Sequence, residues 1–509
     1  MKINFAIVCL CLFTPLTHQC QTLLQAKIID STTQSPIPFA TVSYNNISGV
    51  ISNENGDFQL HLKTTPTQSD SLFFSCLGYE PKTIAALQFT DSLVVLATKS
   101  IALNEVMLFN KNYTVEEIID KVKEQLEKNY TTNYTKSTLF FRESYYTSLI
   151  KKEVTIKTST IPEFNQQFTD SLLNDLPNNS DNFTEILGTL YKNNSAEPED
   201  IDTKLDIIKA SHLYDKDNEI TANAYEEKFN SIIKKRIKRD SYFKIKSGIF
   251  GTKEDMDSTI FADDATKKTD AYLAQQKQLE EDKKKNFLKY RKQTISNIDK
   301  HNFLSEDSDV NIIHKANRYQ FQLLNYTHIN DQYVYKIAFE PKRGEDYKGV
   351  LYVNTDDFAV IRLEYTNVNP IKTFKLLGIS LNVFLKKGTL LYAKNSNNTY
   401  SLKYAEIESA QKAGVDRPLK IIEKNKHVKG RRKQNEVSAD INFQISNRSK
   451  KEMVVFETET INPNTFEDFK EEAQVNPTYL PAYDSEFWKG YNIIEPNQAI
   501  KDFKSLDIE

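Results

Sequence analysis

The stretch GVISNENGDFQLHL, residues 49–62, decides the first part of the fold because it fits two different structures. The spacing of Asn53, Asn55, Gly56 and Asp57 suits a calcium loop, and it also suits a tight turn between strands. In a calcium-binding helix–loop–helix, glycine is the sixth of twelve residues, and the first and last positions supply acidic ligands. Placing Gly56 sixth puts Ile51 first and Leu62 last. Neither side chain can ligate a cation, so the spacing excludes this calcium loop.

The residues after Gly56 point instead to a strand. Phe58, Leu60 and Leu62 alternate with polar residues, which is the period of a half-buried strand. Asn-Gly before such a pattern is the strongest short signal for a β-hairpin, because both residues tolerate positive φ. We therefore predict a steric corner at Asn55-Gly56 rather than a metal site.

The flanking sequence extends this interpretation to a whole domain. Further short apolar runs are separated by Pro, Asn, Ser and Gly, as in a β-sandwich. These runs are Lys27–Asp30, Phe39–Tyr44, Ser71–Leu77 and Ser92–Leu96.

Five motifs in this order resemble the carboxypeptidase-like regulatory domain. They are Ile28–Asp30, Pro36–Val42, Gly49–Phe58, Leu72–Tyr79 and Leu103–Val106. The resemblance covers residues 22–109. It implies a prealbumin-like β-sandwich of the kind common in cell-envelope proteins of Bacteroidota. That module carries no catalytic residues in its family, so the resemblance implies an accessory to the regions that follow.

The N-terminus has the pattern of an export signal. Lys2 precedes the apolar run Ile3–Phe13, and Pro15 ends it before a polar stretch. The run is shorter than the roughly 20 apolar residues that cross a bilayer, and no later segment is long and apolar enough to cross. We predict a signal peptide over residues 1–20 and a periplasmic or outer-membrane-associated protein, with lipidation of Cys20 as an alternative.

Composition narrows the classes of function. The chain has 509 residues, enough for about three domains. Its 66 Lys+Arg and 69 Asp+Glu give a net charge of -3, so no overall field favours nucleic acid. Once the signal region is removed, Cys76 is the one remaining cysteine, and its apolar surroundings predict a buried structural thiol.

Residues 110–300 are mixed and helix-rich. Thr114–Lys128 has apolar residues at helical spacing, Thr114 as N-cap and acidic residues in the first turn. Leu139–Thr158 has an extended pattern, and Ala271–Lys292 a helical one. The basic stretch 232–246 is interpreted as a solvated helix face rather than a contact for nucleic acid or lipid.

Strand patterns return over residues 301–460, where we predict a large antiparallel meander. Residues 349–354 and 358–365 form a hairpin around Thr355–Asp357. This region is similar to the curved half-barrel sheets of lipoprotein-carrier-like envelope proteins. Residues 461–509 are expected to be a C-terminal tail, and FWKGYNIIEPNQAI within it resembles the endings of other such Bacteroidota proteins. The further expected strands are 379–385, 389–393, 399–407, 419–422 and 437–445.

The predicted fold is therefore mainly β with a helical middle region. An N-terminal prealbumin-like β-sandwich precedes an α+β region with a curved antiparallel sheet. One face of that sheet is rich in aromatic and aliphatic residues, and a core covered by helices is favoured over a ligand cavity. The residues of this face are Tyr333, Tyr335, Ile337, Phe339, Ile361, Leu363 and Tyr365.

No catalytic motif emerges from the sequence. A zinc carboxypeptidase needs His-x-x-Glu and a distant His, and the nearest approximations pair His212 with Asp215 and His328 with Asp331. The second pair suits a turn between strands better. There is no phosphate-binding loop, no nucleophile elbow and no Cys-x-x-Cys. We predict no catalytic, cofactor-binding or metal-binding residue and no cofactor.

Two classes of function compete. We favour a non-enzymatic exported envelope protein whose sandwich is an interaction module and whose sheet binds a partner, most simply another envelope protein or an apolar or glycan ligand. The alternatives are a hydrolase with an unrecognised site in residues 110–460 and a carbohydrate-binding accessory module.

Overall fold

The computed structural model describes residues 22–45, 48–99, 113–130, 133–194, 202–238, 240–255, 270–330, 332–342, 344–395, 397–425, 427 and 432–505. The predicted signal peptide and the motif Leu103–Val106 lie outside these ranges. The chain divides into two compact units. Unit 1 comprises residues 1–99 and 484–497, and unit 2 comprises residues 100–483 and 498–509.

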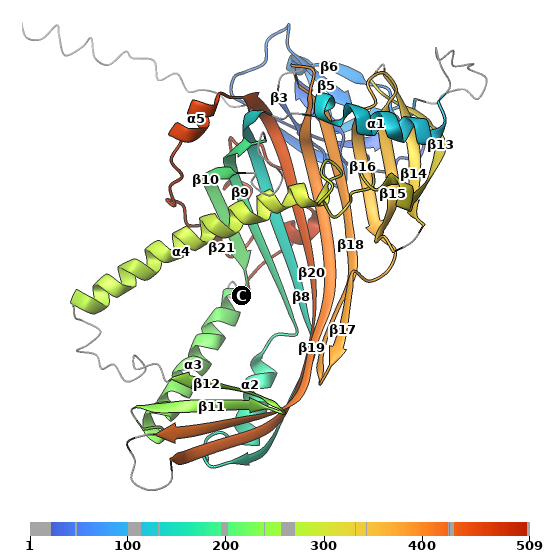
Figure 1. The fold of residues 1–509 in the computed structure, drawn as a ribbon. Helices are drawn as coiled ribbons and strands as arrows, with labels where there is room; N and C mark the ends of the chain where they lie inside the picture. Colours follow the sequence, from blue (N-terminus) through green and yellow to red (C-terminus); the bar gives the residue numbers. More distant parts are fainter. Residues whose placement is uncertain are drawn as a thin grey trace, which may run out of the picture. The chain divides into compact units, whose positions relative to one another are not determined.

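Unit 1 is a β-sandwich (Figure 1). Within the described ranges, one sheet has the order β4-β1-β7 and the other the order β3-β2-β5-β6. The rings of Phe58, Phe74 and Phe89 meet between the sheets at centroid distances of 5.8 to 6.4 Å. The strands are β1 (Thr22–Asp30), β2 (Thr41–Tyr44), β3 (Ser48–Ile51), β4 (Asp57–Leu62), β5 (Ser71–Ser75), β6 (Lys82–Ala85) and β7 (Leu93–Leu96). Cys76 is buried, as the sequence predicted.

The corner at residues 52–56 is steric, but it is not a hairpin. Strand β3 pairs with β2 and strand β4 with β1, so the turn carries the chain from one sheet to the other. Gly56 has φ +77°, and a Cβ there would lie 2.4 Å from the carbonyl oxygen of Ile28. The buried Asn53 shapes the turn, because its Oδ1 accepts hydrogen bonds from the amides of Asn55 and Asp57, both at 2.9 Å.

A segment from the far end of the sequence completes unit 1. The Asn53 amide group donates to the carbonyl oxygen of Glu495 at 3.1 Å. Asn492 Oδ1 accepts a hydrogen bond from the backbone amide of His61 at 2.8 Å. Trp488 is 2 % exposed. Residues 461–509, expected as one tail, are thus shared between the two units.

Unit 2 is built on one large sheet whose neighbouring strands are almost all antiparallel (Figure 1). In the described part of the chain it has 14 strands, in the order β13-β14-β15-β16-β18-β19-β20-β8-β9-β10-β21. Strand β11 pairs with β19 and β12, and β17 pairs with β18. The strands before residue 300 are β8 (Tyr134–Ser159), β9 (Asn179–Asn193), β10 (Thr203–Tyr214), β11 (Ser241–Ser247) and β12 (Phe250–Asp255).

The later strands continue the same sheet. They are β13 (Tyr319–Ile329), β14 (Gln332–Pro341), β15 (Tyr347–Asn354), β16 (Val360–Asn367), β17 (Lys372–Leu376), β18 (Ile379–Lys394), β19 (Tyr400–Asn425), β20 (Lys433–Thr460) and β21 (Thr478–Leu480). The expected boundary at residue 300 is therefore not a boundary in the fold, since β8 pairs with β20 along most of its length. Several expected short strands fuse into β18 and β19.

The helices of unit 2 lie on both faces of the sheet. They are α1 (Val115–Asn129), α2 (Gln166–Asp175), α3 (Lys216–Arg236), α4 (Asp270–Ser296), α5 (Pro463–Asp468) and α6 (Gln498–Lys501), of which α1 and α4 cross one face (Figure 1). On the opposite face, Ile500 of α6 packs with Phe183 and Leu213. Helix α1 begins at the predicted N-cap, where Thr114 and Glu117 form a capping box. Its C-terminal end is tied to the sheet, because Asn129 Nδ2 donates to the carbonyl oxygen of Asp357 at 2.7 Å.

The basic stretch 232–246 differs from its expected structure. Helix α3 ends at Arg236 and β11 begins at Ser241, so the stretch is not one solvated helix face. Ile232, Ile233 and Ile237 pack in a core cluster with Ile161. The lysine pattern suggested a helix surface, whereas the isoleucines between the lysines pack against Ile161, Phe168 of α2, Phe243 of β11 and Val437 of β20.

Candidate functional site

A row of mainly polar and charged side chains crosses the large sheet on the face opposite to α1 and α4. Each member lies directly opposite the next on the neighbouring strand, and we call this row the ladder. From β10 to β14 the ladder consists of Ser211, Glu185, Arg142, Glu452, Glu406, Thr389, Glu364, Val350 and Ala338.

The end of the ladder on β8–β10 is buried. Arg142 and Glu185 are each 1 % exposed, and Nε and Nη2 of Arg142 both lie 2.7 Å from Oε1 of Glu185. Ser211 Oγ donates to the other carboxylate oxygen at 3.1 Å. Burial alone would lower the pKa of Arg142, but Glu185 and Glu452 keep it raised. The guanidinium therefore stays charged inside the protein.

A second row runs beside the ladder on the same face, and each of its members is two residues away from the ladder residue on its strand. It includes Lys387, Glu408 and Lys450, which are cross-strand neighbours. Lys387 Nζ lies 2.9 Å from Glu408 Oε2, and Lys450 Nζ lies 3.0 Å from Glu406 Oε2. Burial raises the pKa of Glu408, but Lys387 and Arg448 lower it more, so its carboxylate is ionised at neutral pH. The two rows form one network of compensated charges.

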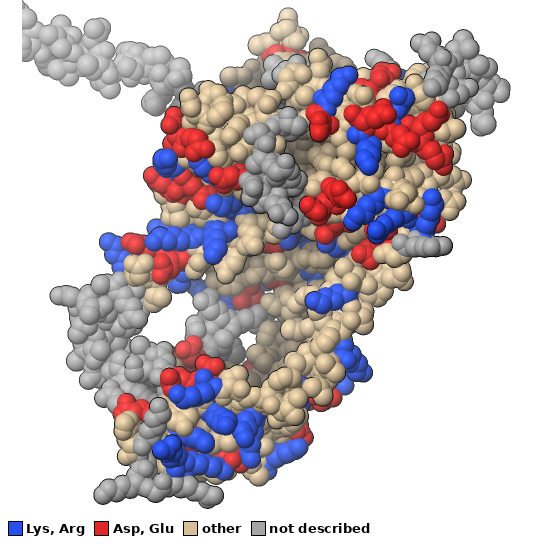
Figure 2. Space-filling view, in the orientation of Figure 1, with Lys and Arg blue, Asp and Glu red and all other residues tan. Residues whose placement is uncertain are grey.

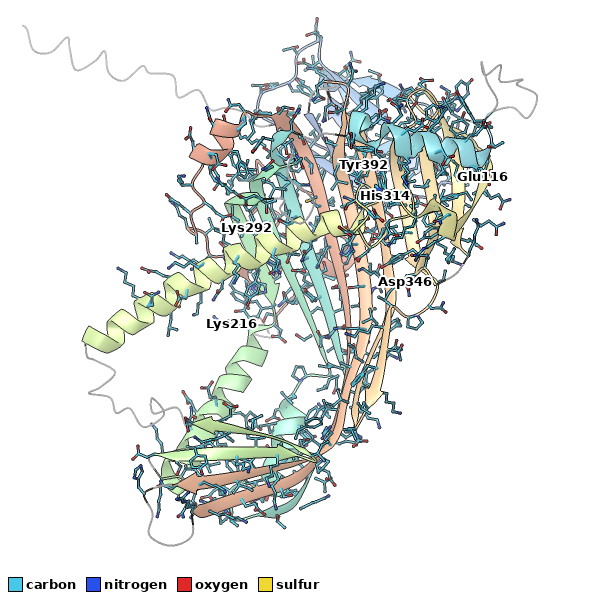
Figure 3. The ribbon with its side chains drawn as sticks, in the orientation of Figure 1. Glu116, Lys216, Lys292, His314, Asp346 and Tyr392 are labelled. Atoms are coloured by element: carbon cyan, nitrogen blue, oxygen red, sulfur yellow. The ribbon has the colours of Figure 1, made fainter. Side chains whose placement is uncertain are left out.

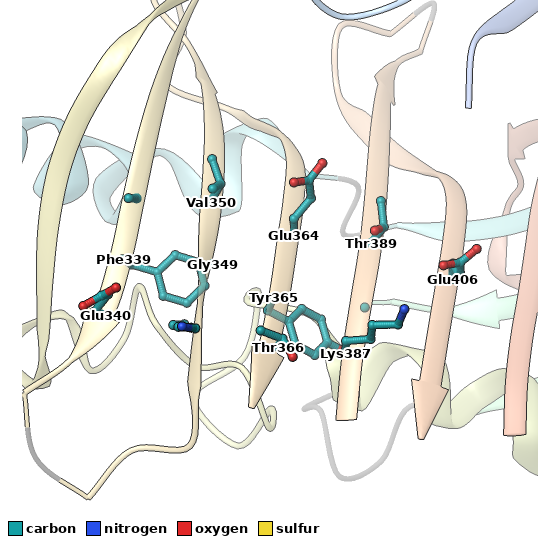
Figure 4. Close-up of a pocket in the computed structure, with 13 residues that line it drawn as sticks. Phe339, Glu340, Gly349, Val350, Glu364, Tyr365, Thr366, Lys387, Thr389 and Glu406 are labelled. Atoms are coloured by element: carbon teal, nitrogen blue, oxygen red, sulfur yellow. The ribbon is translucent and has the colours of Figure 1, made fainter. Parts of the chain in front are cut away.

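Where the two rows leave the buried region, they line a groove of about 440 Å³ over β14, β15, β16, β18 and β19 (Figure 4). The side chains of Glu340, Glu364, Lys387 and Glu406 line it, together with threonines and backbone. A second hollow of about 360 Å³ begins beside it and shares Glu340 and Lys348 as lining residues. The groove is thus lined by charges of both signs.

Two glycines shape the sheet beneath the groove. A Cβ on Gly388 would lie 2.5 Å from the ring of Tyr365, and one on Gly349 would lie 1.9 Å from the carbonyl oxygen of Glu364 and 2.9 Å from Phe339. The aromatic rings on the covered face occupy the space that larger residues at these positions would need. Glycine in a strand interior commonly marks such a close approach.

The aromatic and aliphatic face singled out from the sequence is a core. Tyr335, Ile337, Phe339, Leu363 and Tyr365 are 0 to 3 % exposed. This agrees with the favoured prediction of a core rather than with a ligand cavity at these residues. A register shift at Tyr352/Val353 alters one detail, because Val360 rather than Ile361 lies opposite Val353.

A small space remains between this face and the segment that follows α4. Its volume is about 110 Å³, and Tyr130, Tyr392 and Tyr400 line part of it. Ligand pockets are usually about 300–1,000 Å³. This space is therefore far smaller than a lipid or a glycan needs.

Of the two histidine pairs considered for zinc, His212 and Asp215 have separate hydrogen-bond partners. His212 Nε2 lies 2.9 Å from Asn182 Oδ1, and Asp215 Oδ1 accepts a hydrogen bond from Ser505. His328 is buried, with its ring 4.4 Å from that of Tyr333. Asp331 lies outside the described residues. Among the residues that the structure describes, no three His, Cys, Asp or Glu side chains gather as a metal site.

A second charged cluster, beneath α4, was also missed from the sequence. Glu143 is 1 % exposed, is paired with Arg291 of α4, accepts a hydrogen bond from Tyr145 at 2.9 Å and has Lys451 Nζ at 3.7 Å. Nearby, Lys292 on α4 binds Glu471 at 2.6 Å (Figure 3). The sequence signal for both clusters was Arg142-Glu143 directly after two phenylalanines on β8. Successive strand residues face opposite ways, so Arg142 lies on the ladder face and Glu143 on the face under α4.

Comparisons with known proteins agree with the resemblance of unit 1 and add little for unit 2. No curated protein matches the chain. Similar solved structures include a domain described as an outer membrane lipoprotein-sorting protein from Vibrio parahaemolyticus, with 9 % identity, TM-score 0.22, and coverage of 69 % of this chain and 97 % of that one. A LolA superfamily protein from Nitrosomonas europaea has 9 % identity, TM-score 0.17, and coverage of 70 % and 97 %.

The complex of MucA and MucB from Pseudomonas aeruginosa has 6 % identity, TM-score 0.14, and coverage of 64 % and 92 %. TM-scores this low support no conclusion about fold or activity. None of the helices in the described part of the chain is long and apolar enough to cross a membrane. Residues 24–108 match the CarboxypepD_reg-like domain family, and this match includes all the strands of unit 1 after the start of β1.

Proposed function

We propose that the chain is a non-enzymatic exported accessory protein, and that the charged groove of unit 2 binds an extended segment of a partner protein. The groove is the observation that carries the proposal. It lies on a face lined by charges of both signs, at the exposed end of an otherwise buried ion network. The CarboxypepD_reg-like match over residues 24–108 supports the accessory role, because that module is not catalytic in its family.

The chemistry of the lining favours a polar occupant over the apolar ligand first considered. Lys348 and Glu340 are exposed where the two hollows meet. The groove crosses five strands, and the four spacings between them, at about 4.8 Å each, make a length of roughly 19 Å. An extended segment of about six residues fits that length and can present side chains of both signs. Such complementarity gives specificity and a binding rate that falls with salt.

The buried carboxylates next to the groove have a structural role in this proposal. Glu185 and Glu408 are each held by cations at 2.6 to 2.9 Å. Their charges are compensated inside the protein, which fixes the strands that carry the exposed groove residues. Glu406 belongs to both parts, because it lines the groove and is paired with Lys450.

Site-specific photo-crosslinking in intact cells tests the proposal. A photoreactive residue at Lys348, in the groove, should capture one defined partner. The same residue at Lys289, an exposed lysine on α4, serves as the matched control. Adding Lys387→Glu should abolish the Lys348 crosslink, whereas Lys289→Glu should leave it unchanged. Equal capture from both positions, or capture that Lys387→Glu leaves intact, would contradict a specific groove.

The hydrolase alternative needs its own assay. The purified mature chain should show no turnover of peptide, ester and glycan panels, with or without added divalent metals. Turnover that disappears on substitution of Glu364 or Lys387 would show that the groove is an active site, and the proposed function would then be wrong.

A further inference from the structure

Two β-hairpins of unit 2 end side by side and expose large apolar side chains at their tips. Strands β17 and β18 are joined by the turn Leu377-Gly378, and β11 and β12 by the turn Gly248-Ile249. We call these two turns and their flanking residues the paired tips. The exposed apolar side chains are Ile249 at 84 %, Leu376 at 57 %, Phe250 at 54 %, Leu377 at 53 %, Phe374 at 42 % and Ile379 at 40 %.

Strand β19 places the two tips next to each other. Strand β18 pairs with β19 as far as Val415, and β11 takes up the pairing from Lys420 onward. Figure 1 shows both hairpins reaching the level where β19 bends. The residues of β19 between these pairings therefore face both turns.

Arg417 lies in that interval and fastens the tips together. It is 7 % exposed. Its Nη1 donates to the carbonyl oxygen of Leu377 at 2.6 Å, and its Nε donates to Ser247 Oγ at 2.8 Å. Its guanidinium lies 4.9 Å from the ring centroid of Phe250. The apolar side chains are thus presented by a rigid support rather than by two independent loops.

Leucine is an unfavourable residue for the conformation of the turn at Leu377-Gly378. Leu377 and Gly378 both have positive φ, at 49° and 77°. A two-residue turn with this pair of angles strongly prefers Asn-Gly or Asp-Gly. A bulky residue in the left-handed region is strained, and such strain clusters at functional positions. The choice of leucine therefore favours a role for its exposed side chain.

Lysines outnumber acidic residues beside the two turns. Lys246, Lys372 and Lys375 are exposed there, and the exposed acidic neighbour is Asp416, whose backbone amide donates to the carbonyl oxygen of Gly378 at 2.7 Å. Figure 2 shows Lys and Arg gathered on the same lower part of the unit, over β11 and β12. Apolar side chains ringed by lysine complement a surface with an apolar interior and anionic headgroups.

We propose that the paired tips dock unit 2 onto a lipid leaflet that contains anionic lipids. Ile249, Phe250, Leu376 and Leu377 enter the boundary between headgroups and acyl chains, and the flanking lysines bind the headgroups. An exposed apolar cluster of this kind is uncommon on a soluble protein and marks an interaction site. This inference goes beyond the proposed function and does not depend on the groove, so either proposal can fail alone.

Vesicle co-sedimentation of the mature chain, without residues 1–20, tests the docking surface. One set of vesicles consists of phosphatidylcholine alone, and the other consists of phosphatidylcholine and phosphatidylglycerol in equal amounts. We expect binding to the anionic set that weakens with salt. Ile249→Asp with Leu377→Asp should reduce that binding by roughly tenfold or more, because two apolar anchors become charged. Leu279→Asp, at an exposed leucine of α4, is the matched control and should bind as wild type.

Two further variants separate docking from folding. Leu377→Asn should leave the melting temperature unchanged or raise it, since Asn-Gly suits the turn, and should nevertheless weaken vesicle binding. Lys372→Glu with Lys375→Glu should weaken binding to anionic vesicles by more than tenfold, at about fivefold per lysine removed, and leave neutral vesicles unaffected.

The opposite results would overturn the proposal. These are a folded wild-type chain that ignores anionic vesicles, tip variants that bind as wild type, or an equal loss in Leu279→Asp. Tip variants that abolish self-association in solution while wild type ignores vesicles would show that the tips bind a second copy of the chain instead of lipid.

Discussion

The two faces of the large sheet come from the same strands, yet they are stabilised in different ways. On the face under α1 and α4, Ile337, Leu351 and Leu363 are neighbours on β14, β15 and β16, and all are fully buried. On the other face, the buried positions of β8 and β9 include the charged pair Arg142 and Glu185, next to the apolar pair Phe140 and Leu187. Burial alone therefore does not predict the residue type; the partner across the strand does.

This contrast has an energetic meaning. Burying an apolar side chain is favourable by itself, at about 25 cal/mol per Å² of apolar surface. A buried charge is costly unless its partner is present, and a buried ion pair often contributes little net stability over an apolar pair. We therefore expect the buried apolar area to stabilise the covered face, and the pairing of opposite charges to stabilise the ladder.

The largest expected effect is on the covered face. Leu363→Asp puts an unpaired carboxylate among apolar side chains, so unit 2 should lose about 5 kcal/mol or fail to fold. Thr366→Asp, on the groove face of the same strand between Lys348 and Lys387, is the control and should have a small effect. Chemical denaturation followed by circular dichroism measures both.

Trp488 provides an internal reference for that experiment. It is the one tryptophan of the chain and it belongs to unit 1. Its fluorescence transition should be preserved when Leu363→Asp unfolds unit 2. A Leu363→Asp protein with unchanged circular dichroism would show that this face is not the core.

The next largest effect concerns the buried end of the ladder. Arg142→Met leaves Glu185 buried without its cation and should cost about 3–5 kcal/mol. Combining it with Glu185→Leu removes both charges and should recover most of that loss. Denaturant midpoints of the two single variants and the double variant measure the coupling. Simple addition of the two single losses would mean that the pair does not act as a unit.

An intermediate effect should appear as a pH dependence. Burial, with the charge of Arg291, lowers the pKa of His212 to about 4. Its pKa in the unfolded chain is about 6.5, so the unfolded state binds more protons between these values. The stabilisation from neutral His212 is complete above about pH 6.5 and is lost as the pH falls toward 4.

Unfolding titrations from pH 7 to 4 measure this contribution. His212→Gln should lose less stability than wild type over that range, by about 2–3 kcal/mol. Equal losses in the two chains would show that His212 does not titrate in this way.

The smallest effect is expected at the exposed edge of the charged rows. Arg448 is 58 % exposed in its side chain and shares Glu408 with Lys387. Arg448→Ala should cost less than about 1 kcal/mol, because solvent screens the pair and Lys387 remains. Thermal melting measures it. A loss as large as that of Arg142→Met would remove the distinction between the buried and exposed ends.

The sequence by itself determined the local elements. The capping box at Thr114 and Glu117 and the alternation in β4 are set by neighbours a few residues away, and both appear in the structure. Gly56 is a further case, since its turn requires positive φ whatever surrounds it. The match of residues 24–108 to a known domain family rests on the same kind of local pattern.

Only the tertiary structure decided which distant residues meet. Arg142 and Glu452 lie more than three hundred positions apart, and strand register alone brings them together. The same holds for Asn53 and Glu495 in unit 1, and for Arg417 with Leu377 at the paired tips. A period-two pattern says that successive residues face opposite ways, but not which strand lies alongside. For that physical reason the core face could be inferred from the sequence, whereas the ladder, the groove and the paired tips could not.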